Sequence, residues 1–194
     1  MTEKILKTLL DGNKRFYSGN SIHPNNSQEI RKKLLQKQTP MAVVISCSDS
    51  RAPVELLFDV GIGDLFVIRS AGHILTESEM ASLEYAIEHL KTKLIIVMGH
   101  SCCGAVTSAL QYNKEEHLSS NMSLLIDRIK PAIDKAKTIT NNGNDLLETC
   151  IDNNVYETID YIKQDETLAK LIAELNIHIV PMKYDIETGE VTRI

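Results

Sequence analysis

Short apolar runs constrain the fold of this chain more than any other feature of its sequence. Two runs are unbroken, within 41–46 and 94–98, and shorter ones lie at 65–69 and 177–180. Runs of this length that are rich in β-branched residues are typical of strands covered on both faces, as in a parallel sheet. Segments with helical spacing separate them, at about residues 77–89, 104–110, 145–164 and 167–175. This alternation predicts one α/β domain in which helices flank a largely parallel central sheet.

The two ends of the chain carry additional elements. The spacing of apolar residues predicts a helix over 3–16, and a short polar helix over about 28–38 begins after Ser27, a good N-cap residue. We therefore divide the single domain into an N-terminal helical arm, residues 1–38, and an α/β core, residues 39–194. The core is expected to close with an edge hairpin over 184–191, with Gly189 at its turn.

Composition and charge exclude several classes of protein. The chain has 194 residues and a formal net charge of −5, whereas a nucleic-acid-binding protein usually carries a basic excess. Its longest apolar runs are far shorter than the ~20 residues that cross a membrane. The first residues, Met1 to Lys4, lack the layout of a signal peptide. We expect a cytoplasmic protein with neither a nucleic-acid nor a membrane partner, in which the four cysteines are not disulfides.

Polar and sulfur-bearing residues follow three of the predicted strands. The first strand leads into residues 47–51, the second into 69–73 and the third into 99–104. Ligands of open α/β sheets bind just beyond the carboxyl ends of the strands. Segments that are far apart in the sequence are therefore expected to meet at one edge of the sheet.

Cys47, His100 and Cys103 are the candidate metal ligands in these segments. His100 and Cys103 are three residues apart and share a face if the chain turns helical there. Zinc accepts two sulfurs and one imidazole, and three protein ligands leave a fourth position for water. The alternative is a buried thiol beside a capping histidine. Cys102 would diverge from the ligand face and is expected to be a packing residue, as is Cys150 in the core.

Asp49 and Arg51 form a second candidate pair. They are two residues apart, so in an extended segment both side chains point the same way. The pair is either a structural ion pair or an oriented acceptor for a proton of metal-bound water. Zinc with two thiolates and a neutral imidazole has no net charge, so it should acidify its bound water less than zinc with three neutral ligands does. A nearby carboxylate that orients this water would compensate for the smaller effect.

These motifs resemble those of the β-class carbonic anhydrases. The resemblance rests mainly on Cys47-Ser48-Asp49-Ser50-Arg51 and His100-x-x-Cys103-Gly104, and it extends to weaker motifs at both ends. It implies one Zn²⁺ per subunit on Cys47, His100 and Cys103, with Asp49 and Arg51 as the catalytic dyad. The implied enzyme is a carbonate dehydratase, a zinc lyase that reversibly hydrates carbon dioxide to bicarbonate and a proton through zinc-bound hydroxide. In some members the aspartate, here Asp49, binds the metal in a closed, inactive state.

The resemblance also implies a substrate pocket and an assembly. By position, Gln38, Phe66 and Tyr85 resemble the substrate-binding residues of the plant-like branch. The bicarbonate-regulated branch has a tryptophan where this chain has Val44, so no such regulatory site is expected. The family implies a dimer, often paired into a tetramer, with pockets at the subunit seam.

The role of His73 and the function of the chain each have alternatives. The segment after the second strand departs from the family pattern, and His73 within it is either a proton relay or an ordinary solvated loop histidine. Some enzymes on this scaffold hydrolyse carbon disulfide or carbonyl sulfide instead. A non-catalytic zinc-binding scaffold is a third possibility, although a structural site would more often be closed by a fourth protein ligand.

Overall fold

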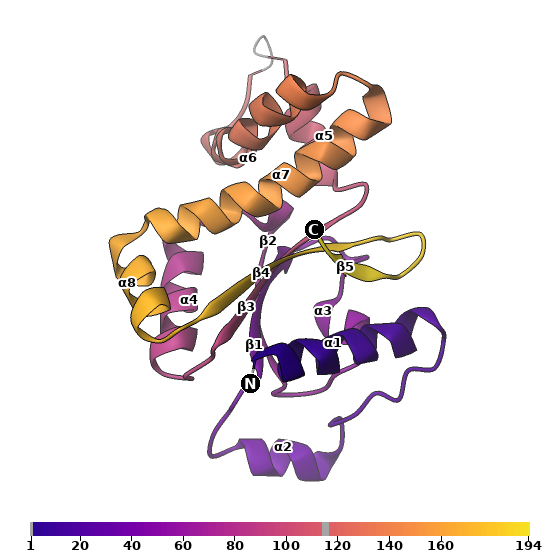
Figure 1. Ribbon diagram of the computed structural model, residues 1–194, viewed down its shortest axis with the longest axis vertical. Helices are drawn as coiled ribbons and strands as arrows, with labels where there is room; N and C mark the ends of the chain where they lie inside the picture. The colour runs from indigo at the N-terminus through magenta and orange to yellow at the C-terminus, as the bar shows by residue number, and fades with distance from the viewer. Residues whose placement is uncertain (1, 114–116) are drawn as a thin grey trace.

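The computed structural model describes residues 2–113 and 117–194 of the chain. A five-stranded sheet lies at the centre of the molecule (Figure 1). The strand order is β2-β1-β3-β4-β5. The first four strands are parallel, and β5 pairs antiparallel with β4. The strands are β1 Ala42–Cys47, β2 Leu65–Ser70, β3 Leu94–His100, β4 His178–Tyr184 and β5 Val191–Arg193. The predicted fold class is thus confirmed, including the C-terminal hairpin.

Two helices precede the first strand, and the others lie in the segments between the strands β1 to β4. They are α1 Thr2–Tyr17, α2 Gln28–Leu34, α3 Val54–Leu57, α4 Glu77–Glu88, α5 Gly104–Gln111, α6 Ser120–Ile139, α7 Gly143–Gln164 and α8 Glu166–Glu174, with a 3₁₀ turn, η1, at Ala71–His73. Ser27 caps α2 by accepting a hydrogen bond from the backbone N–H of Ile30. Thr76 and Glu79 form the capping box of α4. Because these caps are local side-chain contacts, the sequence marks them well.

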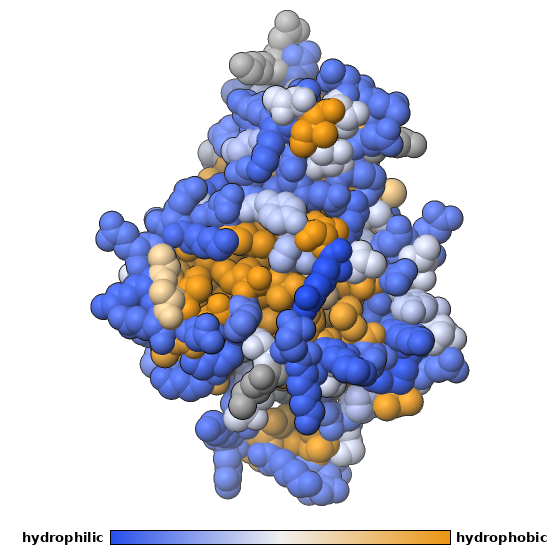
Figure 2. Space-filling view, in the orientation of Figure 1, coloured by the Kyte–Doolittle hydropathy of each residue, from blue (hydrophilic) through white to orange (hydrophobic). Residues whose placement is uncertain are grey.

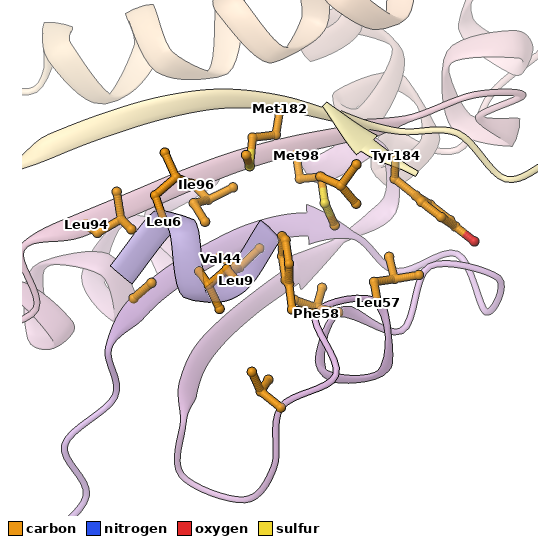
Figure 3. Close-up of a cluster of buried hydrophobic side chains, with 14 of the residues drawn as sticks. Leu6, Leu9, Val44, Leu57, Phe58, Leu94, Ile96, Met98, Met182 and Tyr184 are labelled. Carbon is orange, nitrogen blue, oxygen red and sulfur yellow. The ribbon is translucent and has the colours of Figure 1, made fainter. Parts of the chain in front are cut away.

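The alternation of side chains along the strands divides the core into two layers. Val44 and Ile96 pack with α1 and α3 on one face of the sheet, in the cluster drawn in Figure 3. Their neighbours Val43 and Ile95 pack with α4, α7 and α8 on the other face. Successive strand residues point to opposite faces, so strands covered on both sides are apolar throughout.

A third apolar cluster joins α5, α6 and α7 beyond the sheet. Its buried members include Val106 of α5, Ile129 of α6 and Ile151 of α7. Cys47 and Cys103 belong to this same cluster. Three helices therefore cover the part of the carboxyl end of the sheet where Cys47 and Cys103 lie, while Arg51 and Cys102 beside them are exposed.

The first helix is tied to the rest of the molecule by Gly12 and Asn13. A Cβ atom on Gly12 would lie 1.9 Å from the carbonyl oxygen of Phe58, so only glycine permits this close approach. The buried Asn13 amide donates to the carbonyls of Leu57 and Gly189, both at 3.0 Å. Its oxygen accepts from the N–H of Val191 at 2.8 Å. One side chain thus joins α1, α3 and the C-terminal hairpin.

Part of the sheet is only thinly covered by the chain itself. Figure 2 shows a hydrophobic area in the middle of the molecule, where Figure 1 places β4 between α7 and α1. Ile179 and Val180 of β4 are only partly buried. Among the described residues, no helix has the length and apolar character needed to cross a membrane.

Replacing Asn13 with alanine is expected to lower the free energy of unfolding by about 2–4 kcal/mol, because three buried backbone groups lose their partner. Urea unfolding of both proteins at one protein concentration measures the difference. Asn20→Ala is the matched control, since the Asn20 amide bonds only within an exposed loop. A decrease in the free energy of unfolding of less than about 1 kcal/mol for Asn13→Ala would contradict the role of Asn13 in joining these elements.

Candidate metal centre

The candidate metal ligands meet where two neighbouring strands end. Cys47 is the last residue of β1 and His100 the last residue of β3, while Cys103 is the N-cap of α5. From β1 the chain moves outward to β2, and from β3 it moves outward to β4, so β1 and β3 flank the topological switch point. Open α/β sheets bind their ligands in this crevice.

The three ligand atoms of Cys47, His100 and Cys103 all lie within 4.8 Å of one another, and all three residues are buried. Zinc–sulfur and zinc–nitrogen bonds are about 2.3 and 2.1 Å long, so one tetrahedral ion accommodates ligand atoms at these separations. In the described part of the chain this is the one such cluster of three or more potential ligands.

The backbone fixes which nitrogen of His100 is available. Nδ1 lies 2.9 Å from the carbonyl oxygen of Ser101, which only accepts hydrogen bonds, so Nδ1 carries the proton. Nε2 is therefore the nitrogen with a free lone pair. It is buried and has no hydrogen-bond partner among the described residues. An orphaned acceptor of this kind beside two sulfurs fits a metal ligand.

The side chains of Cys47 and Cys103 are hydrogen-bonded to each other. The hydrogen bond with Cys103 lowers the pKa of Cys47, against the opposing effect of burial. The same contact raises the pKa of Cys103, and burial adds to that rise. Cys47 is therefore the thiol of the pair that ionises more readily, and a bound cation would favour deprotonation of both.

The C-terminal hairpin holds the loop that contains the ligands. The N–H of Ser101 donates to the carbonyl of Tyr184 at 2.9 Å, and the Ser101 hydroxyl accepts from the N–H of Ile186, also at 2.9 Å. Cys102 then adopts a positive φ of 55°, which turns the chain into α5. The hairpin motif that the sequence displays near its end thus supports the metal loop.

Asp49 and Arg51 form a bidentate pair beside the cluster. Arg51 Nε donates to Asp49 Oδ1 at 2.9 Å, and Nη2 donates to Oδ2 at 2.7 Å. The hydrogen bond from Arg51 holds the pKa of the Asp49 carboxyl well below its usual range, against the effect of burial. Asp49 Oδ2 lies 3.8 Å from Nε2 of His100, so this oxygen faces the metal cluster.

The pairing arises from a turn, so the expectation of an extended segment at Asp49 and Arg51 is wrong. The N–H of Ala52 donates to the Asp49 carbonyl at 3.0 Å, and the N–H of Arg51 donates to Asp49 Oδ1 at 2.9 Å. An aspartate that accepts from the backbone two residues ahead is a common way to start a turn. The backbone N–H of Arg51 therefore orients the Asp49 carboxylate in addition to the Arg51 guanidinium.

Sequence reasoning assigned no role to Arg69. Its Nε donates to the carbonyl of Cys47 at 3.0 Å, and its Nη2 donates to the carbonyl of Asp49 at 2.7 Å. One guanidinium from β2 thus holds the loop that carries both a candidate ligand and the Asp49–Arg51 pair. The register of β2 against β1 pairs Arg69 with Ser46, and a strand register of this kind cannot be read from one sequence.

Two other predictions are corrected here. Cys102 is exposed rather than packed, and it contributes its carbonyl, which accepts from Arg51 Nη2 at 3.2 Å. His73 is 1% exposed, so the solvated reading of this histidine is wrong. Cys150 lies in the core as predicted.

The three candidate pocket residues lie apart from the metal ligands of their own chain. The rings of Phe66 and Tyr85 are neighbours, with centroids 6.3 Å apart. Phe66 pairs with Val43, four residues before Cys47, which places it roughly 13 Å back along the sheet. Gln38 is exposed and precedes the amino end of β1, whereas Cys47 is at the carboxyl end.

Two surface cavities of about 350 and 450 Å³ lie between α4, α6, α7 and α8. The first is lined by Arg128 and Asn154 among others, and the second by Met80 and Tyr161. Neither includes a residue of the metal cluster.

Comparison with known proteins identifies the family. Residues 42–191 match the family model described as carbonic anhydrase. The chain is 37% identical to the carbonic anhydrase of Mycolicibacterium smegmatis over 187 residues, covering 95% of this chain and 89% of that one. It is 33% identical to carbonic anhydrase 2 of Mycobacterium tuberculosis over 185 residues, covering 94% and 88%.

Solved structures agree with this result. A β-carbonic anhydrase from Coccomyxa, in complex with acetazolamide, superposes with a TM-score of 0.78 at 25% identity, covering 97% of this chain and 86% of that one. One of two tetrameric β-carbonic anhydrases from Sordaria macrospora gives a TM-score of 0.76 at 26% identity, covering 97% and 96%. With its Cys-His-Cys cluster at the switch point of the same sheet, this chain belongs to the carbonic anhydrase family, in its β class.

Proposed function

We propose that this chain catalyses the reversible hydration of carbon dioxide to bicarbonate and a proton, with one Zn²⁺ per subunit held by Cys47, His100 and Cys103. The observation that carries the proposal is the set of three buried ligand atoms within 4.8 Å, with the carboxylate of Asp49 directed at them. Zinc at such a site acidifies a coordinated water and so supplies a hydroxide nucleophile near neutral pH.

Asp49 is proposed to accept a hydrogen bond from that water. Its Oδ2 faces the metal cluster as a carboxylate, because Arg51 stabilises the ionised form. An ionised carboxylate only accepts hydrogen bonds, so the attacking water must direct a hydrogen toward Asp49 and a lone pair elsewhere. Arg51 fixes the carboxylate, and its own position is fixed by the carbonyl of Cys102.

The same pair suggests how the site would close. For Asp49 to bind the metal as a fourth ligand, it must give up the bidentate contact with Arg51. Two charge-assisted hydrogen bonds oppose that movement. We propose that the closed state therefore requires Asp49 to break both of its hydrogen bonds with the Arg51 side chain.

Gln38, Phe66 and Tyr85 are proposed to bind substrate in the pocket of a partner subunit, as in the plant-like branch. The separation of Phe66 from Cys47 along the sheet favours action across a subunit seam over action within one chain. Tyr85 is 46% exposed, so its side chain is accessible to a second subunit. The proposal requires a dimer or a tetramer, and the hydrophobic area over β4 in Figure 2 is compatible with self-association.

Replacing Cys103 with alanine is expected to abolish zinc binding and turnover together, since one of three ligands is lost. Cys102→Ala is the matched control and keeps both, because only the backbone carbonyl of Cys102 contacts the dyad. Metal analysis and a stopped-flow pH-indicator assay on each sample give the two readouts. Full zinc occupancy in Cys103→Ala, or zinc loss in Cys102→Ala, would reverse the ligand assignment.

Replacing Asp49 with asparagine is expected to keep zinc bound while lowering kcat about 10²–10³-fold, because the amide cannot hold the water as the carboxylate does. Asp134→Asn, which alters an exposed carboxylate paired with Lys130, is expected to leave kcat unchanged. Stopped-flow hydration of carbon dioxide measures both. Unchanged turnover in Asp49→Asn would reduce the dyad to a structural ion pair.

Mixing two inactive variants tests whether Tyr85 acts across subunits. A Cys103→Ala subunit supplies intact Phe66 and Tyr85, and a Phe66→Ala/Tyr85→Ala subunit supplies an intact zinc site. After subunit exchange, half of random dimers are hybrids with one complete site, so about a quarter of wild-type activity returns. Activity that stays at the level of the unmixed variants would place Phe66 and Tyr85 in their own chain's site or outside any site.

A further inference from the structure

The turn η1, Ala71–His73, supplies a hydrogen bond to a metal ligand. The N–H of Gly72 donates to Sγ of Cys47 at 3.3 Å, inside the buried cluster. An N–H donor stabilises a thiolate relative to a thiol, and in a metal site it moderates how much charge the sulfur gives to the ion. The position of this one N–H would therefore affect a metal ion bound by Cys47.

The backbone that presents this N–H is in an unfavourable conformation. Gly72 has a φ of 62°, and His73 follows it with a φ of 46°. Glycine adopts the left-handed region freely, but a histidine there persists only where the surroundings hold it. The question is which contacts hold His73.

Asn154 of α7 contacts both residues of the turn. Its side-chain Nδ2 donates to the carbonyl of Gly72 at 2.8 Å and lies 3.1 Å from Nε2 of His73. An amide group has two hydrogens, so it can make both contacts at once. Asn154 and His73 are each 1% exposed, so water does not compete for these bonds.

The ring of His73 completes the arrangement. Nε2 accepts from Asn154, so the proton is on Nδ1, and burial lowers the pKa of His73 to about 4, which keeps the ring neutral near pH 7. The ring also lies beside Gly99, the residue before the ligand His100: a Cβ on Gly99 would be 3.7 Å from Cε1 of His73. His73 thus lies between the segments that carry two of the ligands.

We infer that His73 and Asn154 are positioning residues for the metal centre, which hold the Gly72 N–H on the sulfur of Cys47. Asn154 acts through both donor contacts, and His73 acts as the acceptor that fixes the left-handed turn. Neither residue belongs to the cluster of candidate ligands or to the Asp49–Arg51 pair. The inference rests on the zinc site proposed above.

The test compares two asparagines that are neighbours on α7. Asn154→Ser removes the contacts with Gly72 and His73, while the control Asn153→Ser removes a buried amide contact with the carbonyl of Ala132 and leaves the turn untouched. Competition with a chromophoric chelator gives the zinc dissociation constant. Asn154→Ser is expected to raise it about 10–100-fold, and Asn153→Ser to leave it within about twofold of wild type.

Cobalt(II) substitution reports on the sulfur itself. Loss of the N–H contact makes the Cys47 thiolate a stronger donor, so the sulfur-to-cobalt charge-transfer band moves to lower energy in Asn154→Ser and stays in place in Asn153→Ser. If both variants lower the melting temperature equally, and neither changes the zinc dissociation constant or this band, Asn154 is merely structural and the inference fails.

Variants of His73 keep the inference testable if Asn154→Ser does not fold. Asparagine tolerates a positive φ and offers an acceptor, whereas alanine offers none. The zinc dissociation constant is expected to increase from wild type to His73→Asn to His73→Ala, and equal values in the three proteins would overturn the role of His73. Wild-type protein that binds zinc but does not hydrate carbon dioxide would refute the proposed function and leave this inference standing.

Discussion

The side-by-side ending of β1 and β3 is the constraint on which the site depends. Their register pairs Ser46 with Met98, so Cys47 and His100 finish at neighbouring points of the same edge. The connections from these strands leave in opposite directions, which opens the crevice between them. Only because α5 begins within this crevice does Cys103 reach the other two candidate ligands.

The candidate metal centre is then held by contacts to its backbone from elements distant in sequence. The C-terminal hairpin holds Ser101, Arg69 of β2 clamps the loop after β1, and the turn at Gly72 points an N–H at a sulfur. Asn13 connects the same hairpin to the first helix. Stability and ligand geometry are thus coupled, since a change in the hairpin would reach both the core and the metal loop.

Sequence patterns predicted the strands, the caps and the ligand set, but several local geometries differed. β4 extends to Tyr184 because pairing with β3 carries it through Pro181 and Lys183, which interrupt the apolar run. Cys102 is exposed because a left-handed turn, not a helix, precedes α5. His73 is buried because α5, α6 and α7 cover the carboxyl end of the sheet, a coverage that no local pattern encodes.

The sequence by itself determined the elements and the chemistry available to them. A single sequence is enough to identify the apolar periodicity, the cap residues and the candidate ligands Cys47, His100 and Cys103, because these are local properties. Tertiary structure alone decided the register of β2 on β1, the bond from Gly72 to Cys47 and the contacts of Asn154. These depend on which distant segments pack together, and packing free energy is a property of the whole fold rather than of any segment.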